Sequence, residues 1–454
     1  MIKTIFADGK TEYEYLRGLA GRDQATGYDV ETSVKQIIED VRRDGDAAVV
    51  SYTKKFDGDA AASSDGGILV IDREGLKKAF EQTEGGVGLA LLHAYENIVD
   101  YHKSQIVHGY EKKLDDGSVL GQTVRGLKRV GIYVPGGSAA YPSTVLMNAV
   151  PAKLAGVEEI VMVSPPRRTS SDLAESSDGY LSSYADINIL AAAYIAGVDK
   201  VILAGGAQAV AALAYGTETF PKVDKIVGPG NVFVATAKRL LFGIVDIDMI
   251  AGPSEILIVA DRSPRNELGS ERAASFVSAD LLSQAEHDPN AASILLTTDE
   301  ILAKEVSEEI ETQLSKLSRA AIARSSIESN GIIILCRSTD EMIAMANEIA
   351  PEHIELLLDD PLSFVPLIEN AGSIFLGNYA PEPLGDYYSG TNHVLPTSGT
   401  ARFSSPLGVY DFIKRTSYTY YTKEKLEAAK DDIMKIGNVE GLTAHVNSIK
   451  IRFE

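Results

Sequence analysis

Short apolar runs rich in β-branched residues recur through most of the chain and alternate with longer amphipathic stretches. Eight of them have the length of buried strands, at residues 129–134, 159–163, 200–203, 224–227, 255–259, 293–297, 331–335 and 373–376. Alanine-rich stretches with helical spacing lie between some of these runs, at residues 145–155, 189–196, 207–215 and 231–241. Strands that alternate with helices of this length form βαβ units, so we predict parallel sheets covered by helices on both faces. The stretch 129–250 is the clearest case and predicts one open, doubly wound sheet.

The two ends of the chain follow a different pattern. Residues 28–54 and 75–105 combine helical spacing with many charges, which predicts exposed helices that pack on another part of the fold. After about residue 408 the alternation stops, so the C-terminus is predicted to form a small separate unit. Three polar stretches rich in Gly, Ser or Pro are predicted to be surface loops, at residues 57–67, 167–184 and 261–271.

The composition narrows the class of protein. The chain has 454 residues, of which 45% are hydrophobic and 24% charged, as in an ordinary globular protein. Its 43 Lys and Arg against 64 Asp and Glu leave a net charge of −21. An acidic surface repels phosphate backbones and anionic lipids, so we expect neither nucleic acid nor a membrane as partner. No apolar run reaches about 18 residues and no secretory signal is apparent, so we expect a cytoplasmic protein.

The cysteine content excludes two further arrangements. Cys336 is the only cysteine in the sequence, so neither a disulfide framework nor a multi-cysteine zinc site can form within the chain. It adjoins the apolar run 331–335, where a small buried hydrophobic residue is expected.

Glycine-rich turns stand at three predicted junctions between a strand and a helix. They are VPGGS at 134–138, GGAQ at 205–208 and GPGN at 228–231. Glycines at such a junction let a phosphate approach the exposed N–H groups of a helix N-terminus, and the carboxyl ends of parallel strands are where open α/β sheets bind ligands. None of the turns matches GxGxxG, so tight packing turns remain an alternative. Their number favours a dinucleotide or phosphate ligand.

A pair of potential metal ligands lies at the end of a predicted helix. Gln284 and His287 are spaced i,i+3 in SQAEHDP, so they share one helix face just before Pro289 should end the helix. One amide oxygen and one imidazole could bind a single ion, with Asp or His from elsewhere completing its coordination. A hydrogen-bonded histidine at a helix end is the structural alternative.

An acid and a histidine also stand side by side in IAPEH. Pro351 suits the first turn of a helix, so we expect Glu352 and His353 at a helix N-terminus. The helix dipole would there keep His353 neutral and able to accept a proton, and it would favour an ionised Glu352. This pair is a candidate for general acid–base catalysis, with helix capping as the alternative.

Two further segments carry polar groups near the C-terminus. Residues 378–400 are rich in Gly and Pro, contain Asp386 and His393, and are too irregular for a helix or a long strand. Loops with such content are often functional. Glu440 and His445 are five positions apart, so they share a face of neither a helix nor a strand.

Taken together, these segments resemble the histidinol dehydrogenase family. The matching motifs occur in the family's order along the chain: GIYVPGG, GGAQA, GPGN, GPSE, SQAEHD, APEH, GDYYSGTNH and EGLTAH. The resemblance covers roughly residues 30 to 452. It implies an oxidoreductase that converts L-histidinol through L-histidinaldehyde to L-histidine with two NAD+, the last step of histidine biosynthesis. It also implies a homodimer with one Zn2+ per subunit.

The resemblance implies a role for specific positions of this sequence. Glu352 and His353 would be the catalytic pair, with His353 as general base and Glu352 activating water. The implied zinc ligands are Gln284, His287, Asp386 and His445. The implied NAD contacts are Tyr133, Gln208 and Asn231. The implied substrate contacts are Ser254, Gln284, His287, His353, Asp386, Glu440 and His445. Glu440 and His445 are expected to reach the site of the partner subunit.

The expected fold is α/β, with two Rossmann-like open parallel-sheet domains, one inserted in the other, and small terminal pieces. The predicted boundaries are an N-terminal extension at 1–29, a first α/β domain at 30–130 and 251–407 that carries the metal and catalytic residues, a second at 131–250 on the NAD side, and a C-terminal domain at 408–454. Two other functions fit the residues less well: the same fold acting on another polar alcohol, and a zinc hydrolase or a non-catalytic binding protein.

Overall fold

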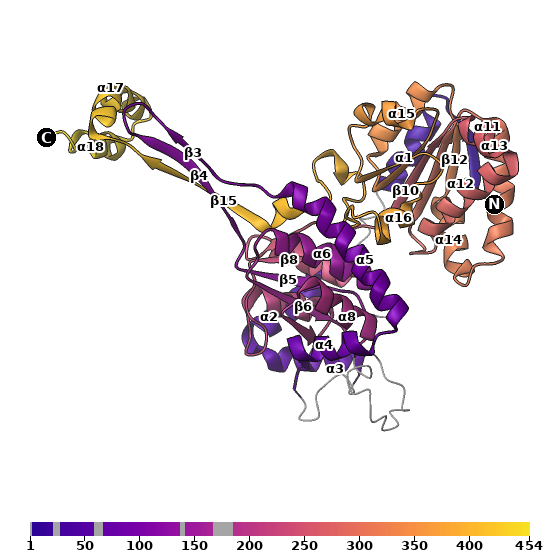
Figure 1. The fold of residues 1–454 in the computed structure, drawn as a ribbon, viewed down its shortest axis with the longest axis horizontal. Helices are drawn as coiled ribbons and strands as arrows, with labels where there is room; N and C mark the ends of the chain where they lie inside the picture. The colour runs from indigo at the N-terminus through magenta and orange to yellow at the C-terminus, as the bar shows by residue number, and fades with distance from the viewer. Residues whose placement is uncertain (1, 21–27, 59–66, 137–140, 167–184) are drawn as a thin grey trace. The chain divides into compact units, whose positions relative to one another are not determined.

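The computed structural model describes residues 2–20, 28–58, 67–136, 141–166 and 185–454 (Figure 1). The chain divides into two compact units. The larger unit consists of Met1–Gln105 and Leu127–Phe412, and the smaller one of Ile106–Gly126 and Ile413–Glu454. Each is described by itself below.

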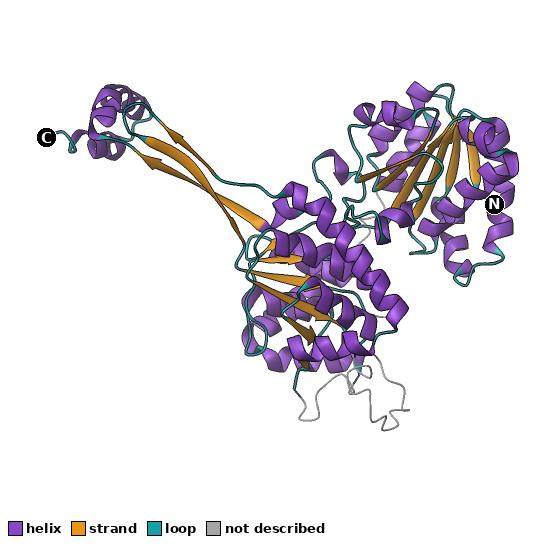
Figure 2. Cartoon of the chain, in the orientation of Figure 1, coloured by secondary structure: helices purple, strands orange, loops and turns teal. Residues whose placement is uncertain are grey.

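The larger unit contains two six-stranded sheets, visible as separate groups of orange arrows in Figure 2. In the first sheet all neighbouring strands are parallel. Its strands in spatial order are β1 (Lys3–Phe6), β12 (Ile332–Leu335), β11 (Ala292–Thr297), β10 (Glu255–Ala260), β13 (His353–Leu357) and β14 (Ser373–Leu376). The central strands are fully buried, which explains why their sequences are continuous Ile, Leu and Val runs.

The second sheet is parallel except for its edge strand β2, which runs antiparallel to β7. Its strands in spatial order are β2 (Val70–Asp72), β7 (Lys200–Leu203), β6 (Glu159–Ser164), β5 (Arg129–Tyr133), β8 (Lys225–Val227) and β9 (Asp246–Ile247). In the sequence this sheet lies wholly between β1 and β10 of the first sheet, so one α/β structure is inserted in the other, as predicted. The predicted fold class is confirmed.

Helices cover both faces of each sheet. On the first sheet one face packs against α12 (Ser270–Ala285), α13 (Glu300–Leu314) and α14 (Ala320–Asn330), and the other against α1 (Thr11–Ala20) and α15 (Thr339–Ile349). On the second sheet one face packs against α4 (Arg73–Gln82), α5 (Gly85–His102), α6 (Pro142–Leu154) and α8 (Ile187–Ala196), and the other against α2 (Tyr28–Asp44), α3 (Asp46–Asp57), α9 (Gly206–Tyr215) and α10 (Val232–Leu241). Four buried apolar layers result.

This packing departs from the predicted domain boundaries at the N-terminal side. Residues 30–130 were assigned to the domain of residues 251–407, but α2 to α5 bury their apolar faces on the second sheet. Conversely, β1 within the predicted extension 1–29 pairs with β12 in the first sheet. The amphipathic spacing of these segments shows that they need a partner surface but carries no information about which sheet supplies it.

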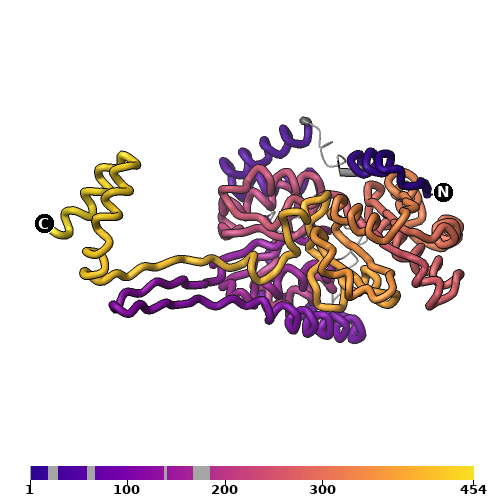
Figure 3. The backbone as a smooth tube through the Cα atoms, turned by 90° about the horizontal axis from the view of Figure 1, so that it is seen from above, coloured from indigo at the N-terminus to yellow at the C-terminus, as the bar shows by residue number. Residues whose placement is uncertain are grey.

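The smaller unit is an antiparallel sheet followed by two helices. Strand β4 (Val119–Gly126) pairs with β3 (Tyr110–Lys113) on one side and with β15 (Ile413–Tyr420) on the other. Figure 3 shows these extended strands running side by side, followed in yellow by α17 (Lys423–Val439) and α18 (Thr443–Lys450). The smaller unit therefore differs from the predicted C-terminal domain at 408–454: it begins at Ile413 and also includes residues 106–126. Strand β3 is exposed along its whole length, so no apolar run marks it in the sequence.

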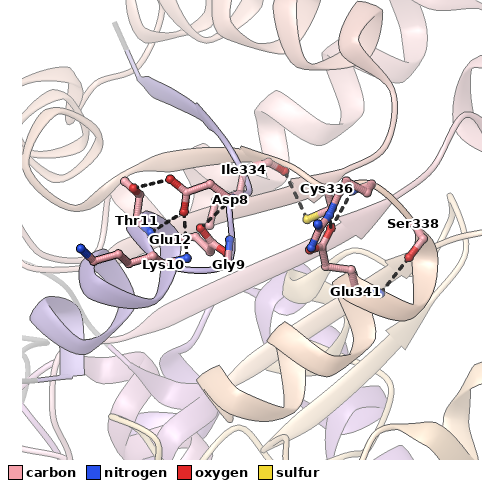
Figure 4. A network of polar contacts seen from close by, with 10 residues as sticks. Asp8, Gly9, Lys10, Thr11, Glu12, Ile334, Cys336, Ser338 and Glu341 are labelled. Atoms are coloured by element: carbon pink, nitrogen blue, oxygen red, sulfur yellow. Dashed lines mark hydrogen bonds and ion pairs between the residues drawn. The ribbon is translucent and has the colours of Figure 1, made fainter.

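Local side-chain hydrogen bonds hold the starts of α1 and α15, two helices that pack on the first sheet (Figure 4). The buried Glu12 carboxylate accepts hydrogen bonds from the N–H groups of Asp8 and Gly9, at 3.1 and 2.7 Å. At α15, the N-cap Ser338 Oγ accepts from Glu341 N, and Glu341 accepts from Arg337 N, one residue before the N-cap, in a variant of the capping box. Cys336 is buried beside it, as predicted, and burial raises the pKa of its thiol to about 12.

The predicted polar loops have different outcomes. Residues 261–271 contain α11 (Ser263–Leu268), which Pro264 starts in its first turn, so this segment is not a plain loop. Residues 167–184 and most of 57–67 lie outside the described residues. Within the described part of the chain, no helix has both the length and the apolar character needed to cross a membrane.

Candidate active site

The polar groups of the candidate site gather where strands of the first sheet begin. Glu255 and His353 are the first residues of the neighbouring strands β10 and β13, and His353 pairs with Ile256 in the parallel register. Helix α12 precedes β11 in the chain, so its C-terminal turn with Gln284 comes to the same amino edge. Helix α16 (Glu382–Tyr387) follows β14 and carries Asp386. Four elements therefore supply the site.

The imidazole of His353 is buried and held in a defined orientation. Its Nδ1 lies 3.0 Å from the main-chain oxygen of Glu255, and because a carbonyl can only accept, Nδ1 must carry the proton. Nε2 is then an acceptor, and it has no hydrogen-bond partner among the described residues. Burial lowers the pKa of His353 to about 4, so the ring is neutral near pH 7. A neutral ring with a free Nε2 is ready to accept a proton.

Glu352 lies beside His353 and is held by β10, the strand that also orients the imidazole of His353. Its Oε2 accepts the N–H of Glu255 at 2.9 Å and lies 3.6 Å from His353 Nδ1. Burial, together with the negative charges of Glu255, Asp386 and Glu382, raises the pKa of the Glu352 carboxyl well above its usual range. A carboxyl with a raised pKa holds its proton more firmly, so it is a stronger base once it has released that proton.

The local structure corrects the prediction that this pair begins a helix. Helix α15 ends before it at Ile349, with Ala350 in the left-handed region at φ 51°, and His353 begins strand β13. No helix dipole therefore acts on the pair from its own segment. His353 is neutral because it is buried, and the charged form of Glu352 is disfavoured rather than favoured.

Several carboxyl groups surround this pair. Glu382 is 2% exposed, and its Oε1 lies 3.9 Å from His353 Nε2. Burial and the neighbouring Asp386 raise the pKa of Glu382 to about 8, and burial raises that of Asp386 to about 6. Deeper in the fold, burial raises the pKa values of Glu355 and Asp280, the latter to about 7. Burial of several ionised carboxyls together is energetically costly unless a positive charge compensates for them.

Three side chains of this site are close enough together to hold a metal ion. His353, Glu382 and Asp386 each offer a ligand atom, and these three atoms lie within 4.8 Å of one another. Gln284 is 1% exposed, and its Oε1 has no hydrogen-bond partner among the described residues. Imidazole nitrogen, carboxylate oxygen and an unpartnered amide oxygen are donors that a zinc ion accepts. A bound cation would also offset the raised pKa values of the carboxyls.

Five of the seven predicted substrate and metal residues lie at this edge, His353 among them, and two are elsewhere. Ser254 directly precedes β10. His287 follows α12 and is exposed, but it is close enough to the site that its charge contributes to the lowered pKa of His353 and partly offsets the raised pKa of Glu382. Gln284 and Asp386 are placed as described above. Glu440 and His445 belong to the smaller unit, where both are exposed.

The predicted NAD residues lie at the carboxyl edge of the second sheet. Tyr133 ends β5, and its hydroxyl accepts a hydrogen bond from Gly206 N at 3.0 Å. Gln208 is buried in the first turn of α9, with an unpartnered Oε1. Asn231 is the N-cap of α10, where its Oδ1 accepts from Phe233 N and Val234 N. In VPGGS, residues 137 and 138 lie outside the described residues.

Sequence reasoning missed Glu382, whose Oε1 lies 3.9 Å from His353 Nε2. Its segment PEPLGD gave only a weak helical signal, because α16 is one and a half turns long and contains a proline. His393 was noted only as part of a polar loop. Burial and the nearby His287 lower the pKa of His393 to about 4, which places it in the same electrostatic environment.

These features define a class: a two-sheet α/β protein with a buried, neutral histidine beside a carboxyl-rich cluster that could hold a metal ion, and with glycine turns at the carboxyl ends of strands of the second sheet. Comparison with known proteins is more specific. The chain belongs to the histidinol dehydrogenase family, a family of oxidoreductases, and the family model matches residues 20–453.

Individual relatives match over nearly their whole length. The histidinol dehydrogenase of Clostridium acetobutylicum is 50% identical over 451 residues, 99% of each chain. That of Lactococcus lactis is 47% identical over 454 residues, all of both chains. The crystal structure of histidinol dehydrogenase from Elizabethkingia anophelis superposes with a TM-score of 0.87 at 35% identity, covering 99% of this chain and 98% of that one.

Proposed function

We propose that the protein oxidises L-histidinol through L-histidinaldehyde to L-histidine, with two NAD+ reduced for each substrate. The observation that carries this proposal is the buried, neutral His353, whose Nδ1 is fixed by a main-chain carbonyl and whose Nε2 is left as an acceptor. Membership of the histidinol dehydrogenase family supplies the substrate class. A primary alcohol loses its hydroxyl proton and a hydride on oxidation, and a base at this position meets the first requirement.

His353 takes the hydroxyl proton of the alcohol at Nε2, and Glu352 activates the water that adds to the aldehyde. The two side chains suit these different tasks because their surroundings shift their pKa values in opposite directions, downward for His353 and upward for Glu352. Both are fixed to the main chain of Glu255, one through its C=O and one through its N–H. The shared anchor keeps the two groups at a constant separation.

Gln284, His287 and Asp386, joined by His445, are the ligands that we propose for one zinc ion per subunit. Glu382 and His353 each have a potential ligand atom within 4.8 Å of one on Asp386, so they would lie close to the bound metal. Zinc supplies a fixed positive charge and open positions for nitrogen or oxygen donors of the substrate. Histidinol offers an amino group and an imidazole, so it can be oriented through two points.

NAD+ is proposed to bind at the carboxyl edge of the second sheet, where Tyr133, Gln208 and Asn231 lie. NAD+ supplies the acceptor for the hydride. The Oε1 of the buried Gln208 has no hydrogen-bond partner among the described residues, and a ligand could supply one. The oxygen atoms of the other two side chains already hold main-chain N–H groups in place.

A homodimer completes this proposal. Glu440 and His445 lie in the smaller unit among exposed apolar side chains, with Ile436, Val439 and Leu442 exposed by 62, 89 and 43%. Such a surface is typical of a protein interface. We propose that a second copy covers it and receives Glu440 and His445 in its site. A cytoplasmic location also belongs to the proposal.

A metal analysis combined with a histidinol assay tests the proposed reaction. The purified protein should contain one zinc per subunit and should form two NADH for each L-histidinol consumed, followed at 340 nm. Removal of the metal with a chelator should abolish turnover, and Zn2+ should restore it. The activity of His93→Ala, which changes an exposed histidine of α5, should equal that of the unaltered protein. Fully metal-loaded protein that leaves histidinol unchanged would overturn the proposal.

A further inference from the structure

A buried ion pair lies directly beneath the glycine turn at residues 228–231. Lys238 belongs to α10, and Asp248 immediately follows β9. Their side chains are 3 and 1% exposed and form an ion pair. Removing two charges from water is costly, and apolar residues in such a place are often as stable or more stable. Fold stability alone therefore does not explain why the chain keeps this pair.

Both members of the pair bind the main chain of one residue, Gly228. The Asp248 Oδ2 accepts the Gly228 N–H at 2.7 Å, and the Lys238 Nζ donates to the Gly228 carbonyl at 3.0 Å. Each charged group thus has two tasks: it neutralises its partner and holds one side of the same residue. A main-chain unit held by charged groups on both sides has little freedom to rotate.

The conformation of Gly228 makes this restraint necessary. Its φ is +104°, in the region that favours glycine, and a Cβ atom there would lie 2.2 Å from the Tyr133 carbonyl oxygen. Glycine permits the close approach of β5 to the turn, but its backbone is also the most flexible of any residue, so it can adopt other conformations. The ion pair opposes that freedom. The turn then continues through Pro229 and Gly230 to Asn231, the N-cap of α10.

We propose that the Lys238–Asp248 ion pair is a positioning device for the dinucleotide-binding turn 228–231. This inference rests on the proposed binding of NAD+ at that edge. Neither side chain reaches the surface, so neither is placed to touch the ligand. The pair acts through Gly228 by keeping the turn and the first N–H groups of α10 in the arrangement that a dinucleotide requires. Affinity for the dinucleotide is the property that depends on it.

The experiment measures NADH binding to the intact, zinc-loaded protein by the change in NADH fluorescence. We expect Asp248→Asn and Lys238→Met to raise the dissociation constant for NADH by about ten-fold or more, because each removes a charged hydrogen bond from Gly228. Zinc content should stay unchanged, and KM should rise for NAD+ but not for histidinol. A purely structural role would lower the melting temperature without this selective loss.

Two further variants keep the test decisive. Lys238→Met/Asp248→Asn leaves no unpaired buried charge, so it folds even if a single variant does not, and it should show the same weakened NADH binding. Lys225→Met is the matched control: it removes a buried lysine of β8 that pairs with Asp246 at 3.0 Å and is not bonded to Gly228. Its NADH affinity should equal that of the unaltered protein.

Each outcome has one meaning. NADH affinity at the unaltered level in a folded Lys238 or Asp248 variant overturns the positioning role. An equal loss of affinity in Lys225→Met also overturns it, because any buried pair of this sheet would then have the same effect. If the unaltered protein itself fails to bind NADH, the proposed function fails instead.

Discussion

At the scale of single residues, the orientation of His353 comes from a neighbouring strand. The Glu255 carbonyl holds Nδ1 and the Glu255 N–H holds Glu352, so one main-chain residue aligns both candidate catalytic groups. The sequence identified the pair but not this arrangement. APEH has the pattern of a helix start, and only the left-handed Ala350 shows that the chain has already left one helix and is turning into a strand.

Replacing His353 tests its role as the base. His353→Ala should lower kcat by about 10²- to 10⁴-fold, the range typical of a lost general base. Zinc content and the dissociation constant for NADH should change little, because the other ligand candidates remain. Turnover and metal content are measured on the same preparation. A variant with unchanged kcat would show that another group takes the proton.

The buried carboxyls make the stability of the metal-free protein dependent on pH. Burial raises the pKa of Glu382 to about 8 and that of Asp280 to about 7, so the folded state keeps protons that the unfolded state has already released. Stability should therefore fall as pH rises from 6.5 to 8. His353 and His393, with pKa values near 4, take up protons on unfolding only below about pH 6.5, so they act outside this window.

Melting temperatures of metal-free and zinc-loaded protein across this window provide the measurement. The metal-free protein should melt at lower temperature as pH rises, and bound zinc should reduce the slope, because the cation stabilises the ionised carboxylates. Equal slopes with and without zinc would argue that the carboxyl cluster does not face the metal.

At the scale of elements, the apolar pattern predicts buried strands well and exposed strands poorly. All eight predicted strands exist, two of them, β7 and β14, with the predicted ends. Strand β13 is fully buried but was missed because its polar start resembles a helix cap. Strands β3 and β15 are exposed and polar along almost their whole length, so no periodic apolar signal marks them.

Asn231 has two roles at the start of α10 that can be separated. Asn231→Ala removes the cap and should lower the free energy of unfolding by about 1 kcal/mol. Asn231→Ser keeps a capping oxygen, so its stability should stay close to that of the unaltered protein. If Asn231 also contacts NAD+, both variants should bind NADH more weakly. Normal NADH affinity in Asn231→Ser would leave capping as the role of this residue.

At the scale of the whole molecule, the two kinds of predicted ligand residue lie at different kinds of sheet edge. The metal-type site lies where strands of the first sheet begin, and the glycine turns lie where strands of the second sheet end. The sequence predicted the second location from the general behaviour of open α/β sheets. The sequence could not predict the first location. The site forms there because α12 and α16 bring Gln284 and Asp386 to that edge, and the positions of these helices depend on tertiary packing.

Mixing two inactive variants tests whether the smaller unit serves the partner. If His445 completes the other subunit's site, a dimer of His353→Ala with His445→Ala contains one intact site. Equal mixing under conditions that allow subunit exchange should then restore about one quarter of full activity, since half of the dimers are mixed and each has one of two sites. No recovery, with exchange shown independently, would place His445 in the site of its own chain.

The pairing of β4 with β15 has a consequence for how the protein is made. Thr123 of β4 pairs with Thr416 of β15, although the two residues are 293 positions apart in the sequence. Translation proceeds from the N-terminus, so β4 leaves the ribosome early. Its partner β15 leaves the ribosome only after the strands of both parallel sheets. The smaller unit, which carries His445, is therefore the last part to form. A chain that terminates before β15 can complete both parallel sheets and yet lack His445, so the proposed metal site can be completed only after both sheets have been synthesised.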